Sequence, residues 1–232
     1  MLGAQGLGFR TRRRVTLPDL IDEVDEELRA ERAKKLAQRY GGFAFGALLL
    51  AIAGVGGWEG WRWYERREAA QAGQAFLTAA RDAAAEGADL RASAERFAGL
   101  AQGAPAGYRT LARLRAAALL AETGQLDAAL AAWEAISRDN EVDPLYRDLA
   151  TVLWGLHALD QGDAAVIEAR MGPLAVPGAP WRASAQEVLA LAALKRGNTE
   201  QARRALQAVL ADATTPQGLR ERASRLLQGL GS

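Results

Sequence analysis

Few residues in this chain have side chains that could perform chemistry. The sequence has no cysteine and one histidine, His157. Disulfides, thiolate nucleophiles, iron–sulfur clusters and cysteine-containing zinc sites are therefore excluded, and one imidazole cannot form a histidine-rich metal site. A Ser-His-Asp relay could use only His157 as its base, and no G-x-S-x-G motif supplies the nucleophile. We expect no enzymatic activity, no metal site and no cofactor.

Composition excludes other classes of site. The pair Gly54 and Gly56 lies inside an apolar run, so it is not a phosphate-binding loop. A formal net charge of +1 argues against a nucleic-acid binder, which would carry a basic excess on one face. The 232 residues, 50% hydrophobic and 25% charged, predict one or two globular units. The function must therefore be sought in the elements and the surfaces that they build.

One apolar segment divides the chain. Residues 40–58 contain no charged side chain, and a helix rising about 1.5 Å per residue over this length just crosses a hydrocarbon core of about 30 Å. Aromatic residues typical of membrane interfaces flank the run: Tyr40, Trp58, Trp61, Trp63 and Tyr64. We predict a transmembrane helix with its interfacial aromatics over 40–63, and the lipid bilayer as its surroundings. The alternative is a buried core helix, for which so many glycines are unfavourable.

The flanks of this segment predict its orientation. A cleaved signal peptide does not fit, because 39 residues precede the run and charged residues follow it directly. Five basic residues precede the span and three follow it: Arg29, Arg32, Lys34, Lys35 and Arg39 against Arg62, Arg66 and Arg67. This asymmetry favours a cytoplasmic N-terminal segment, 1–39, with residues 64–232 across the membrane. The spacings Gly42 to Gly46 and Gly56 to Gly60 match a helix-pairing motif but arise readily by chance, so a homo-oligomer is left open.

An amphipathic helix is predicted before the span. Thr16, with Pro18 and Asp19 after it, is typical of a helix start. Apolar residues then recur at three- and four-residue steps: Leu17, Leu20, Ile21, Val24 and Leu28. Two interpretations stay open, a solvated helix leading into the membrane and a docking helix for the cytosolic face of a partner.

Everything after the span is predicted to be helical, since alanine and leucine dominate and no alternating β-branched run occurs. Breaks near eight positions cut it into about nine helices: Gly87, 103–105, Gly124, 140–144, Gly162, 172–180, Gly197 and 214–216. The glycines at 124, 162 and 197 mark a repeat with spacings of 38 and 35. With Ala129 and Trp133 in the second helix, the unit resembles the tetratricopeptide repeat, although the middle copy around Gly162 is degenerate.

The order of these parts resembles one bacterial family. The stretch D-E-V-D-E-E-L-R-A-E-R-A-K-K-L, one span and a tetratricopeptide-like domain ending in Pro180-Trp181-Arg182 through Leu227 are similar to the ancillary SecYEG translocon subunit (YfgM-like) family. The resemblance covers 19–230 and rests on moderately specific motifs. It implies an all-α fold, a single N-terminal transmembrane helix followed by a tetratricopeptide-like α-solenoid. It also implies a bacterial inner-membrane protein with a periplasmic domain beside the export channel, and Sec translocon subunits, periplasmic chaperones or unfolded client chains as partners.

The repeat register predicts an apolar groove. The first helix of each repeat usually lines the inner face. This places nine candidate contacts there: Leu111, Leu114, Ala118, Leu149, Val152, Leu156, Leu159, Glu187 and Lys195. Such a groove could accept an amphipathic helix or an extended segment. Alternatively, the flanking helices over 65–86 or 217–230 fill it. We expect His157, Trp133 and Trp154 to be structural residues of the core.

Two functions remain open at this point. The first is a membrane-tethered interaction module at the Sec channel that helps pass emerging chains to periplasmic chaperones. The second is an envelope scaffold for cell-division or cell-wall complexes. They differ in the partners that would co-purify with the chain.

Overall fold

The computed structural model describes the backbone of residues 17–231, and the side chains of residue 31 and of residues 34–231 except 37 and 44. These residues form helices joined by short turns, with no strand. The chain divides into two compact units, with the boundary between Tyr64 and Glu65. The first helix, α1 (Leu17–Ala83), contributes to both units, and each unit is described separately.

The first unit contains the apolar part of α1. Its large side chains are exposed, with Phe43 at 81% and Leu50 at 76%. None of the most apolar window of this helix is buried inside the structure. Since a core helix would be covered, the alternative of a buried glycine- and alanine-rich helix is wrong. By length and composition, α1 is the one helix of the described chain that is apolar and long enough to cross a membrane.

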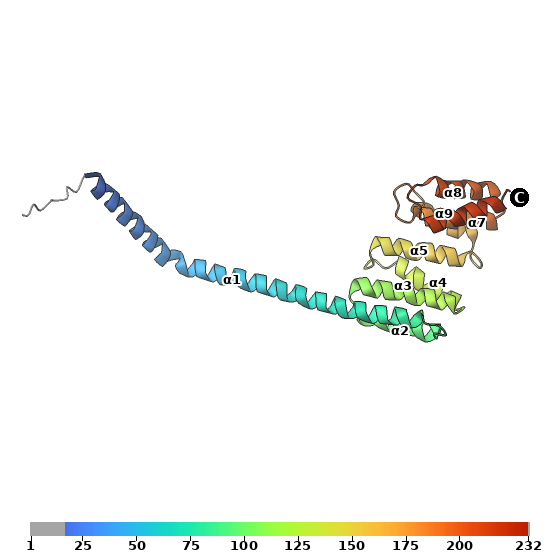
Figure 1. Ribbon diagram of the computed structural model, residues 1–232, viewed down its shortest axis with the longest axis horizontal. Coiled ribbons are helices and arrows are strands. Elements are labelled where there is room, and N and C mark those ends of the chain that lie inside the picture. Colours follow the sequence, from blue (N-terminus) through green and yellow to red (C-terminus); the bar gives the residue numbers. More distant parts are fainter. Residues whose placement is uncertain (1–16, 232) are drawn as a thin grey trace, which may run out of the picture. The chain divides into compact units, whose positions relative to one another are not determined.

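The second unit is a stack of helices in chain order (Figure 1). The end of α1 is followed by α2 (Leu90–Gly103), α3 (Ala106–Glu122), α4 (Leu126–Ser137) and α5 (Pro144–Ala158). The stack continues through α6 (Ala164–Met171), the short 3-10 helix η1 (Gly172–Leu174), α7 (Arg182–Lys195), α8 (Thr199–Ala211) and α9 (Gln217–Gly229). All eight predicted breaks coincide with the ends of α-helices or the connections between them, although Gly103 and Pro144 are terminal residues of α2 and α5 and residues 172–174 form η1. The end of α1 and the helices α2 to α9 give the nine predicted α-helical segments after the span.

Four apolar clusters join neighbouring helices in the same order. The first links α1, α2 and α3, the second α3, α4 and α5, the third α5, α6 and α7, and the fourth α7, α8 and α9. Each of α3, α5 and α7 therefore buries one face against the pair before it and another against the pair after it. Every helix pair is covered only by its neighbours, as in helical-repeat proteins.

The second helix of each pair keeps two core positions. Five and nine residues after the repeat glycine stand Ala129 and Trp133 in α4, and Ala202 and Leu206 in α8; all four are 0% exposed. The degenerate copy places Ile167 and Met171 there, also 0% exposed. It accommodates the larger pair because Gly155 lies opposite, where an added Cβ would come 2.9 Å from the Met171 methyl group. The degenerate repeat thus keeps its core by exchanging small and large residues between helices.

The turns explain why the sequence of the middle repeat, around Gly162, departs from that of the other two. Gly124 and Gly197 have φ of +78° and +74°, a left-handed conformation that glycine adopts without strain. After each, a backbone N–H bonds back across the helix end, Gln125 N to Leu120 O and Asn198 N to Ala193 O, both at 2.8 Å. Gly162 lacks the left-handed φ. There Gly162 N donates to Ala158 O at 2.6 Å. The exposed Lys195 Nζ from α7 donates in addition to the carbonyl oxygens of Leu159, Asp160 and Gly162 at 2.6, 3.2 and 3.0 Å.

Candidate functional site

Most of the predicted groove residues do not line an open surface. Leu114 and Val152 belong to the buried core, at 7% and 5% exposure. Three others are half-buried and pack against core clusters: Ala118, Leu149 and Leu159. Leu111 is half-buried as well. The expectation of one accessible face along these helices is corrected, because α3 and α5 are each covered by the helix pairs on both sides.

Lys195 also has a different role from the predicted one. Its ammonium group caps the C-terminal end of α5, where the carbonyl groups of a helix have no intrahelical donors. The lysine therefore fixes the turn between α5 and α6 rather than presenting a charge in a groove.

Two predicted residues do meet at an open hollow, which we call the α5–α7–α9 hollow. Its volume is about 690 Å³. It is lined by Leu156 from α5, Glu187 and Leu191 from α7, and three residues from α9: Arg222, Arg225 and Leu226. Leu156 is 40% exposed there. The hollow lies between the first helices of two successive pairs, α5 and α7, and the C-terminal helix α9.

The apolar lining of this hollow follows the repeat period. Leu156, Leu191 and Leu226 follow one another at intervals of 35 residues. Glu187 and Arg222 are separated by the same 35 residues. The predicted contacts do not include Leu191, Arg222, Arg225 or Leu226, because only Glu187 and Lys195 are selected from the last repeat and residues 217–230 are assigned to a flanking helix. Applying the 35-residue spacing to Leu156 and Glu187 would have found Leu191, Leu226 and Arg222, but no predicted contact leads to Arg225 in this way.

An ion pair forms the polar part of the hollow. Glu187 is 7% exposed, and Arg222 binds it with two hydrogen bonds, Nε to Oε1 at 2.7 Å and Nη2 to Oε2 at 2.9 Å. The hydrogen bonds to Glu187 raise the pKa of Arg222 above its ordinary value. This two-pronged geometry fixes the plane of the guanidinium group. Arg225, one turn further on, is exposed and has no charged or hydrogen-bonding partner among the described residues.

The C-terminal helix forms a wall of this hollow. Leu219 and Ala223 of α9 are buried against α7 and α8, while Arg222, Arg225 and Leu226 face the open volume. The flanking helix thus extends the repeat surface instead of filling it. At this place the structure lies between the two alternatives, an open groove and a groove filled by a flanking helix, because the hollow is open and α9 forms one of its walls.

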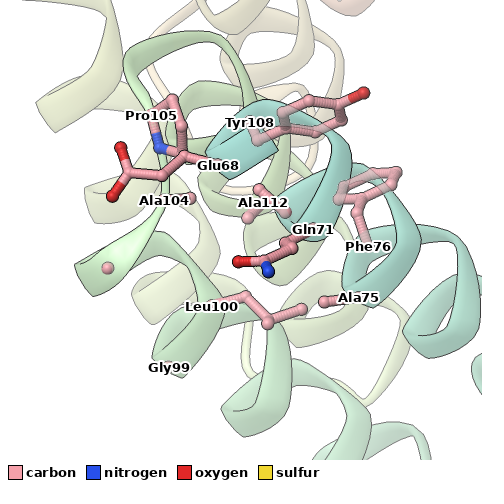
Figure 2. Close-up of a pocket in the computed structure, with 12 residues that line it drawn as sticks. Glu68, Gln71, Ala75, Phe76, Gly99, Leu100, Ala104, Pro105, Tyr108 and Ala112 are labelled. Carbon is pink, nitrogen blue, oxygen red and sulfur yellow. The ribbon is translucent and has the colours of Figure 1, made fainter. Parts of the chain in front are cut away.

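A second hollow lies where α1 joins the repeats (Figure 2). It has a volume of about 350 Å³ and is lined by α1, the end of α2 and the start of α3, with Phe76 and Tyr108 as its aromatic residues and Glu68 and Gln71 as its polar ones. Gly73 makes room for Tyr108, because an added Cβ would lie 2.6 Å from the Tyr108 hydroxyl. The ring centroid of Phe76 lies 5.3 Å from that of Phe97 and 6.3 Å from that of Tyr108. The end of α1 thereby serves as the first helix of the first pair.

The candidate chemical residues pack against other side chains of the repeat domain. His157 stacks on the fully buried Trp133 with ring centroids 4.7 Å apart, and burial lowers the pKa of this imidazole below 6.5. Trp154 is partly buried, and the guanidinium carbon of Arg170 lies 3.9 Å from its ring centroid. Arg170 also binds Glu134 at 2.6 Å and thereby lowers the pKa of that carboxyl. The described part of the chain contains no group of three or more His, Asp or Glu placed to hold a metal ion.

The predicted membrane-facing residues divide into two groups. The interfacial aromatics are exposed on α1, between 52% and 65%: Tyr40, Trp58, Trp61, Trp63 and Tyr64. The predicted docking residues, Leu17 to Leu28, lie on the helical backbone of α1, but their side chains fall outside the described residues. The docking interpretation therefore stays a prediction.

Comparison with known proteins gives one match. A family model described as a tetratricopeptide repeat-like domain matches residues 34–228, which is most of the chain. No curated protein and no solved structure is matched. The matched range includes the part of the first unit from Lys34 onward, and all of the repeat helices except the last residue of α9.

Proposed function

Since the chain belongs to the tetratricopeptide repeat-like domain family, whose members are generally non-catalytic protein-interaction modules, we propose that it is such a module tethered to a bacterial inner membrane and associated with the Sec protein-export channel. It helps to pass emerging chains to periplasmic chaperones. One observation carries the proposal: an exposed apolar helix directly precedes the repeats in the chain.

The tether is supported by the exposure of α1. Soluble proteins rarely leave a contiguous apolar surface of this size in water. In a bilayer the same side chains are in a favourable solvent, and the exposed aromatic residues at 58–64 suit the interfacial depth where such rings concentrate. The excess of basic residues before the span favours a cytoplasmic N-terminal segment and a periplasmic repeat domain.

The export role is supported by the order of the parts. An acidic and then basic amphipathic helix, one span and a repeat domain resemble the ancillary translocon subunits. The α5–α7–α9 hollow offers leucine side chains without a demanding geometry, which suits contact with varied clients. A surface of this kind reads side-chain character rather than a fixed sequence.

Recovery of partners from gently solubilised membranes tests the association. We expect translocon subunits in the mass spectrum with the full-length chain, and their loss when Leu20, Ile21 and Val24 are all replaced by Ser. The matched control replaces Leu77, Val166 and Val176 by Ser, since these three residues are exposed on the repeat domain at 54%, 45% and 50%. The control should retain the translocon. Recovery of division or wall enzymes in place of translocon subunits would overturn the export role and favour the envelope scaffold.

The absence of cysteine makes the orientation directly measurable. Single cysteines introduced by Ala4→Cys and Ala131→Cys would be treated in intact cells with a maleimide that enters the periplasm but does not cross the inner membrane. We expect labelling of the chain carrying Ala131→Cys and none of the chain carrying Ala4→Cys until the membrane is opened. The opposite pattern would contradict the proposed orientation.

A further inference from the structure

The lining of the α5–α7–α9 hollow has a net positive charge. Glu187 is the one acidic side chain in its lining, against Arg222 and Arg225. Arg222 uses Nε and Nη2 for Glu187, so its Nη1 still has two N–H groups to donate. The surplus of one positive charge lies beside an apolar surface.

The geometry of α9 places these donors together. Arg222 and Arg225 are three residues apart, so they lie on the same face of the helix, and Leu226 is four residues after Arg222. Leu156 and Leu191 supply apolar surface from the neighbouring helices. Glu187 orients the Arg222 guanidinium, which reduces the entropy lost when a second anion binds.

From this arrangement we infer that the α5–α7–α9 hollow binds an amphipathic protein segment that carries a carboxylate side chain beside leucine-like side chains. The carboxylate bridges Arg222 Nη1 and Arg225, and the apolar side chains contact Leu156, Leu191 and Leu226. This inference rests on the proposed interaction function and names the chemistry of the partner segment. It predicts selection for acidic over neutral segments of equal apolarity.

Binding of defined peptides to the full-length chain in nanodiscs tests this selection. Three fluorescent peptides of about 14 residues would share leucines at i, i+3, i+4 and i+7 and differ only in flanking Glu, Gln or Lys. We expect the Glu peptide to bind about fivefold more tightly than the Gln peptide, the range of an exposed ion pair, and more tightly still than the Lys peptide. Equal affinity for the Glu and Gln peptides, or no binding of any peptide, would overturn the inference.

A matched pair of variants assigns the preference to the hollow. Arg225→Gln should abolish the difference between the Glu and Gln peptides while leaving the affinity for the Gln peptide unchanged. Arg204→Gln removes the same charge from an exposed position of α8 outside the hollow and should leave the difference intact. A difference that survives Arg225→Gln contradicts the inference, whatever the variants do to folding, because each chain is its own reference between the two peptides.

Other occupants are separate outcomes. Displacement of the Glu peptide by anionic phospholipid vesicles but not by zwitterionic ones would assign the hollow to lipid and overturn the inference. Dependence of the Glu preference on the concentration of the chain itself would assign it to a second copy, with the same consequence. Translocon recovery that is unchanged by Arg225→Gln, combined with absent peptide selection, would leave the proposed function standing and remove only this inference.

Discussion

The apolar part of α1 and the repeat helices are both rich in alanine, glycine and leucine, but they differ in how far their large apolar side chains are exposed. In α1, Phe43, Leu50 and Trp58 are between 65% and 81% exposed. In the repeats, Phe97, Trp133 and Leu206 are 0% exposed. The difference shows that apolar composition alone indicates which side chains must leave water. The spacing of the helix breaks determines whether other helices of the same chain can cover those side chains.

Glycine makes the same contrast at atomic scale. A Cβ added to any glycine between Gly41 and Gly60 would meet nothing within 4 Å. In the repeat domain, a Cβ added to Gly73 or Gly155 would come within 3 Å of a side chain. Gly73 and Gly155 are therefore part of the internal packing of the repeat domain, whereas the glycines between Gly41 and Gly60 are available for contacts outside the chain. Five substitutions or titrations test this contrast, from the largest expected effect to the smallest.

Removing a tryptophan from each region gives the largest difference. Trp133→Ala should lower the free energy of unfolding of the repeat domain by about 3–5 kcal/mol, because a fully buried ring leaves a cavity. Trp58→Ala, at a 65% exposed position, should leave that free energy unchanged. Urea unfolding followed by circular dichroism in detergent micelles measures both. Equal losses would contradict the division into a self-burying and an externally buried region.

A charge on α1 tests where its burial comes from. Leu50→Arg should cost about 2.5–3.5 kcal/mol of membrane insertion, because the position lies in the middle of the apolar run. The chain should then be extracted from membranes by alkaline carbonate. Leu77→Arg is the control, an exposed leucine on the same helix but in the repeat unit, and should leave the chain in the membrane fraction. Extraction of neither variant would argue against a single span at residues 40–58.

Enlarging a small core residue tests the close packing of the repeats. Ala202→Leu should destabilise the repeat domain by about 1–3 kcal/mol, because the position is 0% exposed and has no room for three more carbons. Ala131→Leu makes the same change at an exposed position of α4 and should shift the midpoint little. Thermal unfolding of the two variants side by side is the measurement. A larger loss at Ala131 would show that the repeat register is wrong.

We call the three hydrogen bonds from Lys195 to the α5–α6 turn the Lys195 clamp. Removing this clamp should have a smaller and more local effect on stability. Lys195→Met removes the donor to three carbonyl groups at the α5–α6 turn, and we expect a loss of about 1 kcal/mol, since the lysine is exposed. Hydrogen exchange should accelerate in peptides covering 159–166 and stay unchanged around Gly124. Arg204→Met serves as the control for loss of a nearby exposed cation. Uniform acceleration across the domain would contradict a local clamp.

Acid titration should give the smallest effect. Burial lowers the pKa of His157 in the folded chain, so the unfolded chain binds the proton more tightly. The stability due to neutral His157 is therefore complete above about pH 6.5 and is lost as the pH falls through the folded pKa. Glu134 and Asp139 also have lowered pKa values, because each carboxylate accepts a hydrogen bond from an arginine; their contributions are lost only below about pH 4.5. We expect His157→Phe to reduce the loss of stability between pH 7 and pH 5 by less than about 1 kcal/mol, measured by urea unfolding. An unchanged slope would show that another group titrates there.

Local signals were sufficient for the elements of this fold. Glycine, proline and asparagine at the breaks, and alanine five residues after Gly124 and Gly197, act within a few residues and could be found without the structure. The groove residues could not all be found in this way, because Leu114 and Val152 are covered by helices from neighbouring pairs. The exchange of volume between Gly155 and Met171, and the clamp from Lys195 to Gly162, join residues 16 and 33 positions apart. Neither contact has a signature in either segment alone.

The Lys195 clamp has a consequence for the order in which the chain becomes complete. The turn at Gly124 is closed by its own backbone as soon as Gln125 is present. The turn at Gly162 gains its ammonium donor only when a residue 33 positions later has been made and α7 has packed. In a chain made from its N-terminal end, the Gly124 turn therefore has its hydrogen bonds before α7 exists, whereas the α5–α6 turn at first has only the backbone bond from Gly162 N to Ala158 O. The two turns occupy equivalent places in the repeat, but their hydrogen bonds are completed at different stages of synthesis.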